Sequence, residues 1–317
     1  MRFAIYGTGA VGGYYGGRLA QAGHEVAFIA RGENLRALQT SGLRVDSTQG
    51  DFVLPQVTAT DDPASVGPVD VVIPCVKTWQ IPQAAEAMRP LVGPETLVVT
   101  VQNGVEAPQQ FGEILGMGHM LGGIVKLFTE LVAPGHVVHG GGPAQFLIGE
   151  LDGKITPRAQ GLYAVLKNTQ GIAAEITDNI QAALWEKLLM IAAFGSVGAA
   201  ARAPIGILRS VPETRAMLRA CMEETRAVAA AYGAALYDQA VERAMTFVDT
   251  QPAGGTASTQ RDIIAGRRSE LDSLVGAVVH LGQAAGVAVP VCAPVNCARA
   301  ASWNSACSQP TENPKNI

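Results

Sequence analysis

The stretch "AIYGTGAVGGYYGGRLA" (residues 4–20) decides the fold of this chain. Apolar residues lead into three glycines with the spacing Gly-x-Gly-x-x-Gly, and a helical pattern follows. The first glycine permits a tight turn, the second lets the backbone approach a pyrophosphate, and the third lets helix and strand pack closely. The order strand, glycine loop, helix therefore predicts a dinucleotide-binding fold. The phosphates are expected at the helix N-terminus, where free N–H groups and the helix dipole favour an anion.

The predicted cofactor contacts are the six residues of the glycine loop: Gly7, Thr8, Gly9, Ala10, Val11 and Gly12. The motif alone is a weak signal, because the chain contains 36 glycines. Its context is stronger, since an apolar strand comes before it and a second strand begins about 20 residues later. A glycine-rich turn without a ligand is the alternative interpretation.

The end of the second strand indicates which dinucleotide binds. NAD enzymes place Asp or Glu there to bond the ribose 2′-hydroxyl. This chain instead has Arg31, in "FIARGENLR" (residues 28–36). A guanidinium suits a 2′-phosphate, so the sequence favours NADPH. Glu33, two residues later, argues against this choice, and a plain surface charge is the alternative for Arg31.

The composition narrows the class of protein. The 317 residues are enough for about two domains, and 48% hydrophobic with 16% charged residues are typical of a globular chain rather than a disordered one. A net charge of −4 without any basic run gives no footprint for nucleic acid. The five cysteines contain no CxxC pair, which indicates reduced thiols and no metal site.

No membrane or export segment is predicted. The longest uncharged apolar run, residues 188–201, has 14 residues and is too short to span a bilayer, so we interpret it as buried core. The N-terminus turns into the glycine loop before any apolar region of useful length, unlike a signal peptide. We expect a protein of the cytoplasm.

The first half of the chain alternates short β-branched runs with helical patterns, which is typical of a parallel sheet covered by helices. The predicted strands are residues 2–7, 25–30, 69–76, 96–102, 119–128 and 144–149. Strand signals then stop, and Ala/Leu-rich helical stretches follow at 178–200, 212–233, 238–250, 257–265 and 270–286. We predict an α/β domain over 1–177, an all-helical domain over 178–303, and a disordered tail over 304–317, which is polar and rich in Ser, Asn and Pro.

Polar side chains follow two of the predicted strands. Lys77 comes after "VVIPCV" and Asn103 after "LVVTV". Open α/β sheets bind ligands beyond the carboxyl ends of their strands, so both residues are candidates for the nicotinamide end of the cofactor. Asn-Gly is also a common turn dipeptide, so Asn103 alone indicates little.

A lysine interrupts the apolar segment "AALWEKLLMIAAF" (residues 182–194). In a helix, Lys187 shares one stripe with Leu184, Ile191 and Phe194, because residues three and four apart lie on the same face. The simplest interpretation is that its stem lies along apolar surface while the ammonium reaches water.

Five motifs resemble those of the ketopantoate reductase (2-dehydropantoate 2-reductase) family. They are "GTGAVGGYYGGRLAQAGHEV" (7–26), "VKTWQ" (76–80), "QNGV" (102–105), "LWEKL" (184–188) and "ASTQRDIIAGRRSELDSLVG" (257–276), in the family's order and spacing. The resemblance implies an N-terminal Rossmann-type doubly wound sheet and a helical domain like the C-terminal domain of 6-phosphogluconate dehydrogenase. It also implies NADPH-dependent reduction of a 2-oxo acid, either 2-dehydropantoate or a related branched acid.

The resemblance also implies roles for five residues. Lys187 is the expected catalytic acid and Glu270 its catalytic or substrate-binding partner. Ser258 binds substrate, while Asn103 and Lys77 line the cleft and contact both substrate and cofactor. The chemistry agrees, because hydride arriving at a ketone carbon leaves an alkoxide that needs a proton at once. Apolar surroundings lower the pKa of an ammonium from about 10.4, which helps proton donation.

Ser258 and Glu270 are too far apart to share a small substrate if one straight helix joins them, since twelve residues span about 18 Å. Gly266 is the predicted stop of the first helix, with Ser269 as N-cap of the next and Asp272 in the capping-box position. A turn there folds both side chains toward one site. The alternatives are a helix cap for Ser258 and a helix-dipole contact for Glu270.

The chain departs from the family pattern at two positions. Ile191 stands where an asparagine is frequent one turn after the lysine, and Gly255 stands where another is frequent before Ser258. An apolar residue cannot bond a substrate hydroxyl, so the identity of the 2-oxo acid stays open. Two further alternatives stay open: a homodimer, because alanine-rich helices can bury an interface, and a non-catalytic NADPH sensor.

Overall fold

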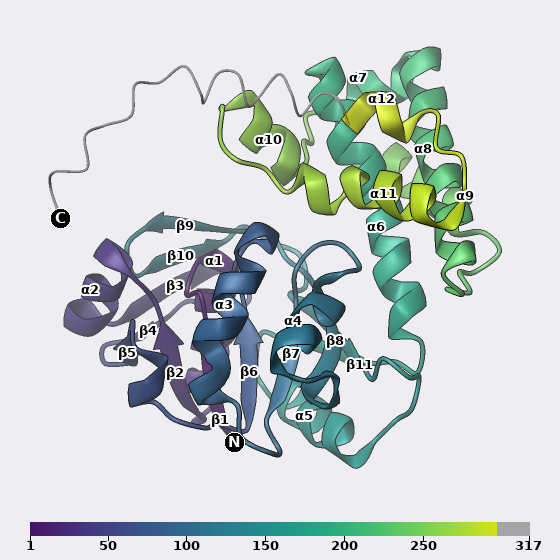
Figure 1. Ribbon diagram of the computed structural model, residues 1–317. Helices are drawn as coiled ribbons and strands as arrows, with labels where there is room; N and C mark the ends of the chain where they lie inside the picture. Colours follow the sequence, from purple (N-terminus) through teal and green to yellow (C-terminus); the bar gives the residue numbers. More distant parts are fainter. Residues whose placement is uncertain (297–317) are drawn as a thin grey trace, which may run out of the picture. The chain divides into compact units, whose positions relative to one another are not determined.

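The computed structural model describes residues 1–296, which form two compact units (Figure 1). The sheet unit comprises residues 1–102 and 106–181, and the helical unit comprises residues 103–105 together with the chain from 182 on. The sequence predicted a boundary near Thr177, and the division falls after Gln181, inside helix α6 (Ile180–Ala201). The tail predicted at 304–317 and the last residues of the predicted helical domain lie outside the described residues.

The sheet unit holds two sheets and five α-helices. Its strands are β1 (Arg2–Tyr6), β2 (Glu25–Ile29), β3 (Leu43–Ser47), β4 (Phe52–Leu54), β5 (Thr58–Thr60), β6 (Val71–Pro74), β7 (Leu97–Thr100), β8 (Met120–Lys126), β9 (Thr129–Ala133), β10 (His136–His139), β11 (Gln145–Gly149) and β12 (Ala173–Ile176). Its helices are α1 (Ala10–Gln21), α2 (Gly32–Ser41), α3 (Ile81–Met88), α4 (Ala107–Leu115) and α5 (Pro157–Lys167).

The main sheet has the order β12-β11-β8-β7-β6-β1-β2-β5, and the second sheet has the order β4-β3-β10-β9. The neighbours from β8 through β5 pair in parallel, as predicted, whereas β11 is antiparallel to β8. All six predicted strands are present, each shorter than expected by one to four residues, and the strand predicted at 69–76 is reduced to Val71–Pro74. The strands that the sequence missed have three to five residues, and some are largely exposed, as in β9, so they lack an apolar run.

Buried side chains alternate between the two faces of the main sheet. In β1, Phe3 and Ile5 share an apolar cluster with Tyr15 and Leu19 of α1, while Ala4 belongs to the cluster that contains α3 and α4 residues. In Figure 1, α3 and α4 lie in front of this sheet and α1 behind it. Helices therefore cover both faces of the sheet. A ligand can bind at the carboxyl ends of the strands, where the glycine loop lies.

Helix α1 packs against both sheets, and its paired glycines make room on its two sides. A Cβ on Gly16 would lie 2.6 Å from Cγ1 of Ile5 in β1, and a Cβ on Gly13 would lie 2.8 Å from Cγ2 of Val137 in β10. Such contacts are too short for a packed interior. The run "GGYYGG" is therefore a packing device as well as part of the nucleotide motif.

Every element from residue 180 to 296 is helical. The α-helices are α6 (Ile180–Ala201), α7 (Ile205–Ser210), α8 (Pro212–Ala231), α9 (Ala240–Thr250), α10 (Ser258–Ile264), α11 (Val275–Ala285) and α12 (Cys292–Asn296). The short helices α7 and α12 were not predicted, because six and five residues are too few to show a helical period.

Helix α6 is the central helix of this unit. Its 22 residues agree with the helical stretch predicted at 178–200 and begin well before the uncharged run 188–201. With a mean hydropathy of 1.3 it is long and apolar enough to cross a membrane. In the structure 67% of this stretch is buried, and residues such as Leu188, Leu189 and Ala193 form the apolar core with α8, α9 and α11. This burial is that of a core helix.

Candidate active site

The glycine loop is anchored to the end of the neighbouring strand. The amides of Gly7 and Thr8 both donate to the carbonyl oxygen of Ile29 at 3.0 Å, and the Thr8 hydroxyl donates to the same oxygen at 3.1 Å. Gly7 has φ +95°, a left-handed conformation that favours glycine. The loop therefore turns sharply over the end of β1 and points the N-terminus of α1 outward.

Gly9 and Gly12 serve different purposes in this turn. A Cβ on Gly12 would lie 2.6 Å from the carbonyl oxygen of Gly7 and 3.2 Å from Cβ of Cys75, whereas a Cβ on Gly9 would meet nothing within 4 Å. Gly12 thus permits the close packing of helix on strand, and Gly9 leaves open space at the helix N-cap. A pyrophosphate on the first amides of α1 fits this open position.

Asn34, which the sequence analysis did not assign, holds the loop from the other side. Its Nδ2 donates to the carbonyl oxygen of Thr8 at 2.5 Å, and its Oδ1 accepts from the amide of Gly135 at 2.8 Å. The residue links the glycine loop to the turn between β9 and β10. Its position three residues after Arg31 gave no signal, because both partners are distant in sequence.

Arg31 lies at the N-cap of α2 and is exposed. Glu33, the residue that argued for NADH, forms an exposed ion pair with Arg36 at 2.7 Å. The Glu33 carboxylate thus pairs with a residue of its own helix, one turn away. The Arg31 guanidinium supplies a positive charge just after the end of β2. This arrangement fits a 2′-phosphate better than a free 2′-hydroxyl.

The ends of β6 and β7 are tied together by Gln102, another residue that the sequence did not single out. Its Nε2 donates to the carbonyl oxygens of Pro74 at 2.7 Å and Val76 at 3.2 Å. This buried amide fixes the backbone that leads to exposed Lys77. Burial raises the pKa of the neighbouring Cys75 thiol to about 12, so Cys75 packs beneath the loop as a neutral group.

Asn103 belongs to the helical unit together with Gly104 and Val105. A Cβ on Gly104, which has φ +104°, would lie 2.6 Å from the carbonyl oxygen of Ser273. Ser273 in turn donates its amide (3.1 Å) and its hydroxyl (3.0 Å) to the carbonyl oxygen of Glu270. The close approach at Gly104 therefore brings Asn103, which is half-buried, beside the segment that carries Glu270.

Lys187 is half-buried on α6, as are Met190, Ile191 and Phe194 on the same side of the helix. The three apolar residues pack at the margin of the helical core. Glu186, by contrast, accepts from Arg243 at 2.8 Å and from the amide of Tyr237 at 3.3 Å. The predicted stripe around the lysine is thus present, and the adjacent carboxylate is directed to α9.

Ser258 is the first residue of α10 and is exposed. The N-cap is Ala257, so the alternative role of Ser258 as a helix cap is wrong. Ala257 and Thr259, on either side of it, face Gly195 of α6, whose added Cβ would lie 3.7 and 3.6 Å from theirs. This contact sets Ser258 beside α6, two turns beyond Lys187.

The predicted break after α10 is confirmed, although its details differ. The helix ends at Ile264, and Gly266 follows with φ +66°. Glu270, only 6% exposed, precedes a single 3₁₀ turn (Leu271–Ser273), and α11 begins later, at Val275, with Leu274 as its N-cap. The prediction of a helix from 270 capped by Ser269 was therefore wrong.

Asp272, expected in a capping box, instead lies inside that 3₁₀ turn and is exposed. Gln260, which the sequence analysis did not single out, anchors the start of α10. Its Nε2 donates to the carbonyl oxygen of Ala203 at 2.9 Å, and its Oε1 is the nearest atom to Gly198, 2.7 Å from an added Cβ. The small residue on α6 thus admits the amide that fixes the segment bearing Ser258.

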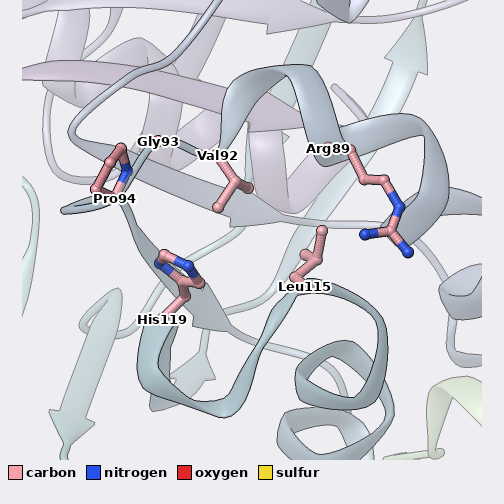
Figure 2. Close-up of a pocket in the computed structure, with 6 residues that line it drawn as sticks. All are labelled: Arg89, Val92, Gly93, Pro94, Leu115 and His119. Atoms are coloured by element: carbon pink, nitrogen blue, oxygen red, sulfur yellow. The ribbon is translucent and has the colours of Figure 1, made fainter.

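A surface pocket of about 340 Å³ lies at the opposite edge of the main sheet (Figure 2). It is lined by Arg89, Val92, Gly93, Pro94, Leu115 and His119, which precede β7 and β8 or end the helices before them. The two polar groups are engaged, since Arg89 pairs with Glu86 at 2.5 Å and His119 Nδ1 bonds the carbonyl of Thr96 at 2.9 Å. This pocket is separate from the glycine loop.

Comparison with known proteins agrees with this geometry. Residues 3–153 match the family model described as ketopantoate reductase PanE/ApbA, and residues 179–295 match its C-terminal model. The 2-dehydropantoate 2-reductase of Nostoc sp. is 30% identical over 301 residues (93% of this chain, 92% of that protein). That of Halobacterium salinarum is 31% identical over 293 residues (92% and 95%).

Solved structures give the same result over nearly the whole chain. A PanE/ApbA family ketopantoate reductase from Ralstonia eutropha is 35% identical, with a TM-score of 0.88 over 96% of this chain and 100% of that one. Both kinds of comparison span the sheet unit and the helical unit. The chain belongs to the ketopantoate reductase family and is an NADPH-dependent oxidoreductase.

Proposed function

We propose that this enzyme reduces a 2-oxo acid to the 2-hydroxy acid with NADPH and uses Lys187 as the general acid. The observation that carries the proposal is Lys187 itself, a half-buried lysine on an apolar stripe of α6, in the same unit as Asn103, Ser258 and Glu270. The family and its curated relatives support the class of reaction.

The cofactor would be held by the sheet unit. The open position at Gly9 and the first amides of α1 take the pyrophosphate, and Arg31 takes the 2′-phosphate. Thr8, Ala10 and Val11 complete the loop, while Lys77 and Asn103 are proposed contacts of both cofactor and substrate. When bound, NADPH supplies the hydride.

Lys187 would donate its proton to the carbonyl oxygen of the substrate as negative charge develops on that oxygen. An ammonium that lies beside the reacting oxygen can act as a general acid and release its proton there. Proton donation and the positive charge both stabilise the nascent alkoxide. A lysine in open water offers neither advantage to the same extent.

Glu270, Ser258 and Asn103 would position the substrate around this proton donor. Ser258 offers a hydroxyl donor for the carboxylate of the acid, and Asn103 offers an amide. Glu270 is proposed to act with Lys187 in the catalytic step. The substrate is 2-dehydropantoate or a related branched 2-oxo acid, and we propose the cytoplasm as the compartment, for a monomer or a homodimer.

The test follows NADPH absorbance with a panel of 2-oxo acids that includes 2-dehydropantoate, with NADH as control. Lys187→Ala is expected to lower turnover about 10²- to 10⁴-fold with NADPH affinity nearly intact. Lys154→Ala, which removes a lysine that is 73% exposed, is the matched control and should retain turnover. Tight NADPH binding without oxidation by any acid would instead support the sensor.

A further inference from the structure

The surface around Lys187 is apolar in both directions along α6. Toward the start of the helix its neighbours on the same face are Ala183 and Leu184, four and three residues before it. Toward the end they are Met190 and Ile191, with Phe194 one turn further. None of these side chains carries an oxygen or nitrogen, so these positions of α6 offer a substrate no strong hydrogen-bond donor or acceptor.

The loop before α10 adds no polar side chain at Gly255. Gly255 stands in the loop before α10, where its amide donates to the carbonyl oxygen of Pro252 at 2.8 Å and its own carbonyl accepts from Ile205 at 2.9 Å. A Cβ there would lie 3.0 Å from that Pro252 oxygen. The position is thus occupied by tightly bonded backbone without a polar side chain.

The reacting oxygen must lie within hydrogen-bond distance of Lys187 Nζ, at about 2.8 Å. The first side-chain carbon of a 2-oxo acid is only two bonds from that oxygen, so this side chain must also lie close to Lys187 and its neighbours. On this surface an alkyl or aryl group gains free energy by leaving water. A hydroxyl leaves water without finding a partner among these apolar side chains of α6.

We propose that Ile191 makes this enzyme a reductase of 2-oxo acids with an apolar branched or aromatic side chain that carries no hydroxyl. The inference rests on the proposed function and narrows its substrate class. It assigns to Ile191 a specificity-determining role, because Ile191 lies one turn from the proton donor and presents a half-buried alkyl group there.

Two acids of nearly the same shape test this directly. The first is 2-dehydropantoate (4-hydroxy-3,3-dimethyl-2-oxobutanoate). The second is 3,3-dimethyl-2-oxobutanoate, which differs from the first only in lacking the terminal hydroxyl. An apolar site discriminates against an added hydroxyl by up to about 100-fold. We expect kcat/KM with NADPH to be about 10- to 100-fold higher for the acid without the hydroxyl. Equal values, or a preference for 2-dehydropantoate, overturn the proposal.

The variant Ile191→Asn tests the residue. It should shift the ratio of the two kcat/KM values at least about 10-fold toward 2-dehydropantoate, since the amide can bond the hydroxyl. Ile191→Leu keeps the surface apolar and should keep the ratio. Ile207→Asn, the same exchange at a side chain that is 52% exposed on α7, is the matched control. An unchanged ratio in Ile191→Asn overturns the role of Ile191.

Binding measurements separate this inference from the proposed function. Isothermal titration of both acids into the wild-type enzyme with oxidised NADP should give the same ranking without any turnover. If neither acid oxidises NADPH while the apolar acid binds more tightly, the reduction is refuted and the specificity stands. Tighter binding of 2-dehydropantoate refutes the specificity whatever the activity.

Discussion

The side-chain amide of Asn34 bonds the carbonyl oxygen of Thr8 at 2.5 Å, so the start of α2 holds the glycine loop in place. The same side chain also accepts from the amide of Gly135 at 2.8 Å. One asparagine therefore connects the loop, the helix that begins with the 2′-phosphate candidate, and the turn between β9 and β10. The relationship makes Asn34 a positioning residue for the cofactor.

Asn34→Ala should weaken NADPH binding more than it slows chemistry. Loss of two hydrogen bonds, each contributing about 1 kcal/mol, is expected to raise the Kd for NADPH by up to about 30-fold. Fluorescence titration measures that Kd, and saturating NADPH should restore kcat to near the wild-type value. Gln39→Ala on the same helix, which removes a bond to the carbonyl of Ala59 at 3.1 Å, is the control. An unchanged Kd in Asn34→Ala would refute the role.

Arg31→Ala should change the choice of cofactor. Removal of the guanidinium takes away the charge proposed to pair with the 2′-phosphate, so the ratio of kcat/KM for NADPH to that for NADH should fall about 10- to 100-fold. Arg36→Ala removes a guanidinium already paired with Glu33 and should change the ratio less than about threefold. Equal effects of the two substitutions would remove the special role of Arg31.

Lys187→Arg separates proton donation from charge. Arginine keeps the positive charge but does not release its proton near neutral pH. If Lys187 acts as the acid, Lys187→Arg should lose about 10²-fold or more in kcat, like Lys187→Ala. Turnover near the wild-type value in Lys187→Arg would show that the position supplies only charge. Steady-state kinetics with saturating NADPH and acid measure the difference.

The sequence identified the parts of the fold that have a period or a turn signature. Gly7 to Gly12 and six largely buried strands of the main sheet were found because apolar runs and glycine spacing are local signals. The second sheet was missed because β4 has three residues and β9 is largely exposed. Asn34 and Gln102 were missed for a different reason, since each acts on backbone more than 20 residues away.

His139 gives a pH dependence of stability in the sheet unit. The residue is 1% exposed, and burial, with Arg18 nearby, holds its pKa below the ordinary 6.5. Below pH 6.5 the unfolded chain protonates His139 more readily than the folded protein does. The contribution of His139 to the free energy of unfolding is therefore present above this pH and is lost as the pH falls. Wild-type Tm should fall from pH 7.5 to 5.5 more steeply than that of His139→Gln.

The buried histidine also bonds the Ser47 hydroxyl through Nδ1 at 3.0 Å, so His139→Gln is expected to be less stable at every pH. Only the difference between the two proteins in how steeply Tm changes with pH tests the protonation of His139. His24, whose pKa is also lowered by burial, is present in both proteins and cancels in that difference. Parallel curves for the two proteins would contradict the assignment.

Replacing glycine by alanine should have opposite effects on stability at Gly16 of α1 and at Gly161 of α5. In Gly16→Ala the new methyl would lie 2.6 Å from Cγ1 of Ile5 and 2.7 Å from Cε1 of Phe28, so the helix must move off the sheet. Overpacking of this kind costs about 1–3 kcal/mol of unfolding free energy. In Gly161→Ala, on α5, the methyl would meet only Cε of Met1, at 4.0 Å. That variant should gain about 0.5–1 kcal/mol from helix propensity. Urea denaturation measures the free energy of unfolding of both variants. If Gly16→Ala lost no more stability than Gly161→Ala, the added methyl would not be overpacked, and α1 would not be packed closely against β1.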